Sequence, residues 1–175
     1  EAMAAEHDDG AMSRALVQRF CDAFAVDRCS LMRVDEQHLQ ITAHRGLDPG
    51  IAGRVRLPLG QGVAGWVAHH RKPVPMRKAG DASPVRPTGV DSYNSDSFVS
   101  VPLVHRNRLL GVLNLSNKRN GQPFDETDLD RAMMASAVLS LAMSQREESE
   151  EHLRAAATAL LDPPVAPQVA ETNTP

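Results

Sequence analysis

Residues 97–118 read SFVSVPLVHRNRLLGVLNLSNK. Two apolar runs, Phe98–Val104 and Leu109–Leu115, flank a short polar connector. Runs of this kind, rich in Val and Leu, are typical of two neighbouring antiparallel strands. Pro102 donates no hydrogen bond to a ladder, so it indicates an edge position, a bulge or a bend, while Gly111 allows a bulge or a close backbone approach. We therefore predict a central β-hairpin, with the rest of the chain covering its two faces.

The chain before this hairpin predicts a helix, two strands and a second helix. Apolar residues recur every four positions in residues 10–24, which indicates one face of an amphipathic helix. Short, partly alternating segments at residues 28–35 and 37–44 indicate two strands. Residues 45–62 are rich in Gly and Pro and lose periodicity, so we expect a long ordered loop there. Residues 62–70 predict a short helix that packs against the sheet.

Two further segments lie on either side of the hairpin. Residues 72–76 contain two prolines and predict a short edge strand. Residues 77–94 predict a long polar loop, and loops of this length are often functional. Residues 128–144 predict a helix that is apolar over a wide arc, so we expect it to bury one side on the sheet and another on a partner.

Length and composition indicate one domain with tails. The chain has 175 residues, of which 42% are hydrophobic, and these values are typical of a single globular domain. Charged residues dominate after residue 145, and the last residues are polar and rich in Pro. The predicted divisions are a flexible N-terminus at 1–9, the domain at 10–144, a helical extension at 145–161 and a disordered tail at 162–175.

Charge and cysteine content exclude several classes of protein. A formal net charge of -3 indicates no overall attraction to nucleic acid or to an anionic membrane. No apolar run approaches the roughly 20 residues needed to span a bilayer, and the acidic N-terminus does not resemble a signal peptide. Cys21 and Cys29 form no C-x-x-C motif, so we expect no disulfide framework and a cytoplasmic location.

Several motifs, in their order and spacing, resemble those of GAF domains. These are small α/β sensor modules of cyclic-nucleotide phosphodiesterases, phytochromes and bacterial signalling proteins. The motifs are RCSL at 28–31, GQGVAGWV at 60–67, KPV at 72–74, SFVSVPL at 97–103 and LGVLNLSNK at 110–118, followed by Phe124 and Asp128. The resemblance covers roughly residues 10–144. It implies an α+β fold with a central antiparallel sheet of about six strands, terminal helices on one face and the loops of a ligand pocket on the other.

The resemblance also implies residues that line the pocket. By position, Ser30, Tyr93, Ser95, Phe98 and Ser100 match lining residues of such pockets. Tyr93 and Phe98 would stack on a planar ring, and the serines would hydrogen-bond its edges. Ordinary strand packing is the alternative for Phe98 and Ser100. A register error of one residue would turn both of them into the helical core.

A second motif, that of the cyclic-nucleotide-binding members of the family, is matched only in part. Cyclic-nucleotide-binding members carry an Asn-Lys pair, then Phe, and then Asp-Glu, and here Asn117, Lys118, Phe124 and Asp128 match while Leu129 replaces the Glu. In the family the Lys and Asp form a salt bridge near the pocket and do not grip the nucleotide. The alternative is that Lys118 and Asp128 only fasten the hairpin to the last helix. A nucleotide or cyclic nucleotide is the ligand class we consider, and the sequence identifies no certain cofactor.

Enzymatic and metal chemistry receive little support. The seven histidines are scattered without the spacing of metal ligands, so we expect no metal site. Reductases of free methionine sulfoxide form one GAF subgroup and depend on cysteines around the pocket loops. This chain has no cysteine after Cys29, so we predict no catalytic residues and no enzyme.

The sequence therefore predicts a regulatory sensor domain. It would bind a small molecule under residues 77–94 and signal through residues 10–24 and 128–161, the terminal helices of a homodimer. The alternative is a structural dimerisation module with a vestigial, ligand-free pocket. We expect no nucleic acid and no membrane among its partners.

Overall fold

The structure is a computed structural model of the chain, and it describes residues 2–76 and 97–161. The strands are β1 (Val26–Asp35), β2 (His38–Arg45), β3 (Arg56–Pro58), β4 (Val74–Met76), β5 (Phe98–His105) and β6 (Arg108–Lys118). The helices are α1 (Ala2–Ala23), α2 (Pro49–Ala52), α3 (Gly62–His70) and α4 (Glu126–Leu161).

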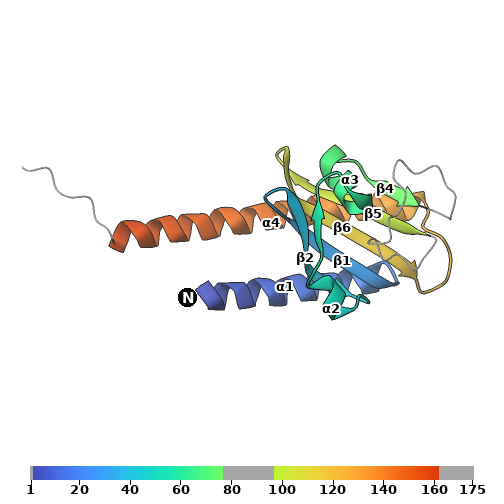
Figure 1. Cartoon of the computed structure of the whole chain (residues 1–175), viewed down its shortest axis with the longest axis horizontal. Coiled ribbons are helices and arrows are strands. Elements are labelled where there is room, and N and C mark those ends of the chain that lie inside the picture. Colours follow the sequence, from blue (N-terminus) through green and yellow to red (C-terminus); the bar gives the residue numbers. More distant parts are fainter. Residues whose placement is uncertain (1, 77–96, 162–175) are drawn as a thin grey trace, which may run out of the picture.

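The strands form one six-stranded sheet in the order β3-β2-β1-β6-β5-β4, and every neighbouring pair is antiparallel. The predicted hairpin is β5–β6, which lies inside the sheet (Figure 1). The pairing of β1 with β6 brings the first and last strands of the chain together at the centre of the sheet. The predicted α+β fold with an antiparallel sheet is confirmed.

Helices cover both faces of this sheet. The long helices α1 and α4 lie side by side, and α3 packs on the opposite side of the sheet (Figure 1). Two separate apolar clusters follow from the alternation of side chains along each strand. The cluster on the helix face joins α1 and α4 to residues such as Leu31, Val101 and Leu113. The cluster on the α3 face joins α3 to residues such as Met32, Phe98 and Val112.

Both unusual residues of the central hairpin have a structural reason. A side chain at position 111 would place its Cβ 2.0 Å from the Met32 carbonyl oxygen, so only Gly permits this approach of β6 to β1. The β4 strand pairs with β5 only as far as Ser100, so Pro102 lies beyond that pairing. The register also shifts between Leu103 and Val104, which is the irregularity that Pro102 indicated.

On the helix face, α1 and α4 contact the sheet in different ways. Val17 and Cys21 of α1 and Phe24 just after it are buried, whereas Met12, at the start of the predicted apolar stripe, is 52% exposed. Four small residues of α4 at four-residue spacing are buried against the sheet: Ala132, Ser136, Ser140 and Ser144. Small side chains let the helix backbone approach closely. The Ser136 and Ser140 hydroxyls donate to helix carbonyls at 2.8 and 2.6 Å, so their burial leaves these groups paired.

Some predicted boundaries were wrong. The predicted loop at 45–62 contains α2 and β3, which are too short to leave a periodic signal. Helix α1 begins at Ala2 instead of Gly10, and α4 begins at Glu126 instead of Asp128. The continuation of α4 to Leu161 agrees with the predicted helical extension at 145–161. The predicted loop at 77–94 and the tail at 162–175 lie outside the described residues. Within the described ranges, no helix combines the length and the apolar character that crossing a membrane requires.

Candidate ligand-binding site

A row of three buried polar side chains crosses the centre of the sheet. Ser30 of β1 pairs in register with Asn114 of β6, and Asn114 pairs with Ser100 of β5. The Ser100 hydroxyl donates to Asn114 Oδ1 at 2.7 Å, and Asn114 Nδ2 donates to Ser30 Oγ at 3.2 Å. Their exposed fractions are 8% for Ser30, 6% for Asn114 and 0% for Ser100. We call these three residues the polar row.

The polar row lies on the α3 face of the sheet. Leu31, Val101 and Leu113 belong to the cluster on the helix face. Side chains alternate along a strand, so the neighbouring Ser30, Ser100 and Asn114 point to the opposite face. Phe98 lies two residues before Ser100 and packs in the cluster of the α3 face. Phe98 and Ser100 therefore avoid the helical core, which was the risk of a one-residue register error.

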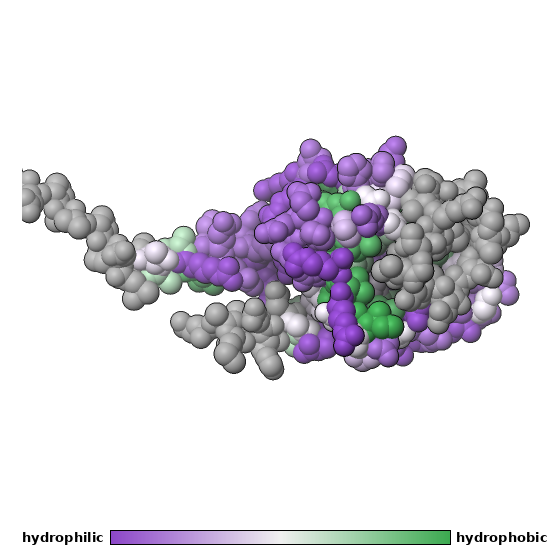
Figure 2. All heavy atoms as spheres, viewed as in Figure 1, coloured by the Kyte–Doolittle hydropathy of each residue, from purple (hydrophilic) through white to green (hydrophobic). Residues whose placement is uncertain are grey.

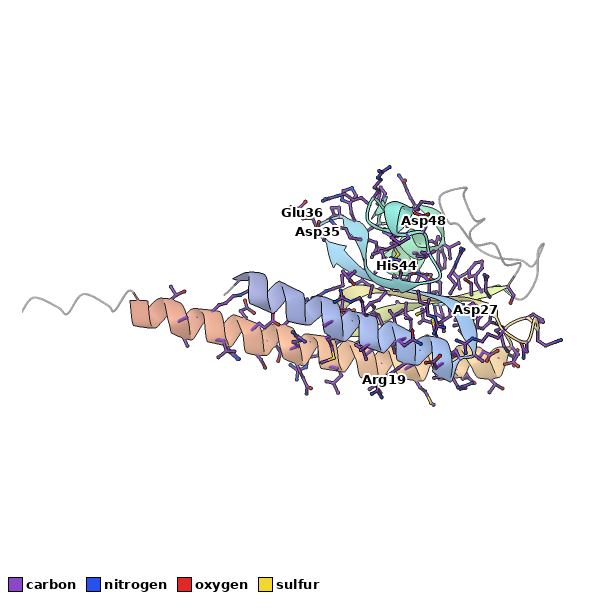
Figure 3. The ribbon with its side chains drawn as sticks, turned by 90° about the horizontal axis from the view of Figure 1, so that it is seen from below. Arg19, Asp27, Asp35, Glu36, His44 and Asp48 are labelled. Atoms are coloured by element: carbon purple, nitrogen blue, oxygen red, sulfur yellow. The ribbon has the colours of Figure 1, made fainter. Side chains whose placement is uncertain are left out.

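His44 extends the polar row toward the edge of the sheet. His44 lies on β2 and pairs in register with Ser30 on β1, so the two side chains share a face. Figure 3 shows His44 away from α1 and α4. Its Nδ1 is buried and has no hydrogen-bond partner among the residues that the structure describes. A buried imidazole nitrogen in this state is available to a ligand that offers a complementary donor or acceptor.

The surroundings of the polar row are apolar. Val63 and Val67 of α3 and Leu39 of β2 are fully buried in the same cluster as Phe98. The space-filling view shows a band of hydrophobic residues at the end of the molecule that holds the sheet, with hydrophilic residues beside this band (Figure 2). Hydroxyl, amide and imidazole groups in such surroundings suit the polar edge of a ligand. In the described ranges no group of three His, Cys, Asp or Glu side chains is placed to hold a metal ion.

The structure places the second motif at the junction of β6 and α4. Lys118 Nζ donates to Asp128 Oδ2 at 2.6 Å, and the two side chains are 12% and 9% exposed. Asp128 Oδ2 also accepts from the Asp125 backbone N–H, while Asp125 Oδ1 accepts from the Asp128 backbone N–H. This reciprocal capping starts α4. Phe124 is buried, and Lys118 Nζ lies 5.5 Å from the centre of its ring.

Asn117 adopts the backbone conformation that turns the chain at this junction. Its φ of 60° lies in the left-handed region, where Asn is tolerated better than most residues other than Gly. Its Oδ1 is buried without a hydrogen-bond partner among the described residues. The turn of the backbone at Asn117 comes directly before Lys118, which reaches Asp128.

Farther along α4, ion pairs at Glu147 and Glu148 join the helix to the sheet, and the sequence did not predict these pairs. Glu147 accepts from Arg33 of β1 and from Arg108 of β6. Arg106, in the turn of the hairpin, lies 3.9 Å from Glu148. Helix α4 is therefore joined to β6 at both ends of the strand, through Lys118–Asp128 and through Arg108–Glu147.

An apolar groove runs between α1 and α4. Its volume is about 560 Å³. Helix α1 contributes Met12, Leu16 and Phe20, and α4 contributes residues that include Met134 and Val138. Met134 and Val138 are 65% and 70% exposed, which is unusual for large apolar side chains. We call this feature the helical groove.

The sequence predicted part of this candidate site. Ser30, Phe98 and Ser100 lie on one face of the sheet, whereas Tyr93 and Ser95 lie outside the described residues. It missed Asn114 and His44. The signal for Asn114 was present, because it is the one polar residue inside the apolar run Leu109–Leu115. His44 left no such signal, since only the pairing of β2 with β1 brings it beside Ser30.

Comparisons with known proteins find a family model and solved structures that are similar to this chain. The family model for the GAF domain matches residues 10–143. The chain is similar to the GAF domain of the phosphoenolpyruvate-protein phosphotransferase from Acinetobacter, with 28% identity, a TM-score of 0.64, and coverage of 79% of this chain and 83% of that chain. It is also similar to the second GAF domain of DevS from Mycobacterium smegmatis, with 14% identity, a TM-score of 0.67, and coverage of 82% and 99%.

Some proteins that share the fold are enzymes. The structure of free methionine-R-sulfoxide reductase from Neisseria meningitidis, in complex with its substrate, has 23% identity and a TM-score of 0.66, and the match covers 80% of each chain. At this identity the likeness shows the fold alone. The fold is thus compatible with regulatory and with enzymatic proteins.

Proposed function

The chain belongs to the GAF domain family, a family of sensor and regulatory modules, and we propose that it binds a small molecule on the α3 face of its sheet and signals through the terminal helices of a homodimer. The observation that carries this proposal is the polar row. A sheet that only needed a packed core would place apolar residues at these central positions, because burying hydroxyl and amide groups costs free energy even when they are paired.

The chemistry of the row suggests the class of ligand. Ser30, Asn114, Ser100 and His44 offer hydrogen-bond donors and acceptors in a line, and Phe98 lies on the same face. A planar heterocycle suits this arrangement, because its edge can hydrogen-bond while its ring contacts apolar side chains. A nucleotide or a cyclic nucleotide is the ligand class that we propose to test first.

A signal from this face has a short covalent and ionic route to α4. Asn114 lies on β6, which ends at Lys118, and Lys118 pairs with Asp128 in the first turn of α4. A shift of β6 on ligand binding would move both anchors of α4, Asp128 and Glu147, together. The transmission we propose is therefore a rigid movement of α4 against α1.

We propose that a second copy of the chain occupies the helical groove. The groove is mostly apolar, although Arg33, Arg146, Glu147 and Glu150 also line it. Helix α4 carries the exposed Met134 and Val138 along the groove, and Leu153, farther along the helix, is 71% exposed. Exposed apolar stripes on helices are typical of protein–protein contacts. The variant Val138→Glu should shift the mass in light scattering from dimer to monomer. Ala137→Glu adds the same charge on an exposed part of α4 outside the groove and should leave the dimer intact.

Ligand binding is tested by thermal shift. A compound present at about 100 times its Kd should raise the melting temperature by roughly 5 °C. Asn114→Leu should abolish the shift, whereas Asn120→Leu, at an exposed turn, should retain it. If no nucleotide or other planar heterocycle shifts the wild-type chain and nothing co-purifies with it, the sensor function is wrong.

The helical groove also favours a second function, a structural dimerisation module whose α3 face binds nothing. It predicts a dimer in light scattering together with the absence of any thermal shift. We further propose that the domain is not an enzyme, and a sample incubated with free methionine sulfoxide and a thiol reductant should show no turnover. Two free buried thiols fit a reducing compartment, so we place the domain in the cytoplasm.

A further inference from the structure

The turn between β5 and β6 is hydrogen-bonded to the end of α3. Arg106 and Asn107 form this two-residue turn, which we call the β5–β6 turn. Arg71, the cap residue directly after α3, donates from Nη1 to Asn107 Oδ1 at 2.7 Å. Both residues are exposed, so the bond lies on the surface of the molecule. It joins the helix of the α3 face to the end of the central hairpin.

The same turn contacts α4, which lies on the other face of the sheet (Figure 1). Arg106 Nη1 lies 3.9 Å from Glu148 Oε1. Arg108, the first residue after the turn, donates to Glu147. Neighbouring residues of one turn therefore contact α3 and α4, two helices that the sheet separates.

The residues chosen for this bridge indicate that their side chains have a role. The φ values of Arg71, Arg106 and Asn107 are 54°, 45° and 64°, which lie in the left-handed region. Gly adopts this region without the clash of a Cβ atom, and it is common after a helix and in a two-residue hairpin turn. Arg in this region costs backbone free energy. In return, these side chains form contacts between elements that Gly could not form.

The β5–β6 turn holds α4 where this helix leaves the sheet. Ser144 is the last buried residue of α4, and the described side chains after it are half-buried or exposed. Glu147 and Glu148 follow within about one helical turn, and α4 continues to Leu161. A displacement at this point changes the direction of the part of α4 beyond the sheet. The contacts of Arg71 and Arg106 are exposed and therefore weak, so they affect position more than stability.

We propose that the β5–β6 turn couples α3 to the part of α4 beyond the sheet, so that a movement of α3 shifts the direction in which α4 leaves the domain. Arg71 with Asn107 forms the first link, and the contacts of Arg106 and Arg108 with α4 form the second. The source of the movement, a ligand on the α3 face, rests on the proposed function. The coupling itself is a property of the chain without ligand. It is separate from the junction of β6 with the beginning of α4.

Hydrogen exchange of the whole chain without ligand tests the coupling. Arg71→Gly suits the left-handed backbone and removes the guanidinium, so the melting temperature should stay within about 2 °C of that of the natural chain. Mass spectrometry should show the backbone amides of residues 143–153 exchanging about threefold faster, because a helix that is held less firmly opens more often. Asn107→Gly should give the same increase. The double variant should add nothing further, since both changes remove one hydrogen bond.

Two further variants make each outcome decisive. Glu147→Gln weakens the contact of α4 with Arg108 directly, and it should also raise exchange in residues 143–153. Glu36→Gly changes an exposed left-handed residue in the turn between β1 and β2, and it should leave exchange in α4 unchanged. The coupling is overturned if either Arg71→Gly or Glu147→Gln leaves exchange in α4 unchanged, or if Glu36→Gly raises it. Faster exchange throughout the chain in Arg71→Gly would overturn it equally, because that result reports a loss of global stability.

Ligand binding and coupling can fail separately. Exchange is measured without ligand, whereas the sensor function is tested by thermal shift with nucleotides and other planar heterocycles. A chain that binds a ligand but shows no coupling is a sensor that signals by another route. A coupled chain that binds nothing is not a sensor.

Discussion

The two faces of the sheet use the same strands for different purposes. On the helix face, residues such as Leu31, Val101 and Leu113 are buried under α1 and α4 in a continuous apolar cluster. On the α3 face, the next residues along the same strands include the polar row of Ser30, Asn114 and Ser100. Burial is nearly complete on both faces. The difference is therefore in polarity, and it supports the proposal that the α3 face binds a ligand.

The largest expected effect lies on the helix face. Leu113→Ala removes a fully buried side chain from the centre of β6, and it should lower the free energy of unfolding by about 4 kcal/mol in urea denaturation. Leu109→Ala, at the half-buried start of the same strand, should cost clearly less. Equal losses at the two positions would mean that the helix face is not the main source of stability.

The junction of β6 and α4 should show the next largest effect. Asp128→Ala leaves Lys118 without its partner in a nearly buried position and removes a cap of α4, so it should cost about 3 kcal/mol. The double variant with Lys118→Met should recover part of this loss, because an unpaired buried charge no longer remains. Asp130→Ala, exposed on the same helix turn, is the matched control. An Asp128 variant as stable as the control would contradict the anchoring role.

The polar row should show a smaller effect of a different kind. Asn114→Ala leaves the hydroxyls of Ser30 and Ser100 without their amide partner and should cost about 2 kcal/mol. The triple variant Ser30→Ala, Asn114→Leu and Ser100→Ala should be within about 1 kcal/mol of the natural chain, because both sides of each hydrogen bond become apolar. If the triple variant unfolds, the row is structural, and the contrast between the two faces disappears.

The smallest effect concerns Asn117. Replacement by Val places a β-branched residue in the left-handed region and should cost about 1 kcal/mol or slightly more, whereas Asn117→Gly should be nearly neutral. Differential scanning fluorimetry resolves this order. A Val variant that melts with the Gly variant would show that the backbone at this position relaxes without strain.

Local sequence signals predicted most of the sheet and little of the site. The hairpin, the close approach at Gly111 and the edge character of β4 follow from residue types and short spacings. α2 and β3 were missed because elements of four and three residues carry no period. Glu147 gave no signal either, since it is one of several acids in a charged stretch, and only docking of α4 selects it for Arg33 and Arg108.

The sequence by itself determined the family, the antiparallel sheet and the positions of its central strands, because apolar runs, Pro, Gly and Asn-Lys motifs act over short distances along the chain. Only the tertiary structure decided which side chains of neighbouring strands lie beside one another. Ser30, His44, Ser100 and Asn114 are far apart in sequence and share one row because the register of three strand pairs aligns them.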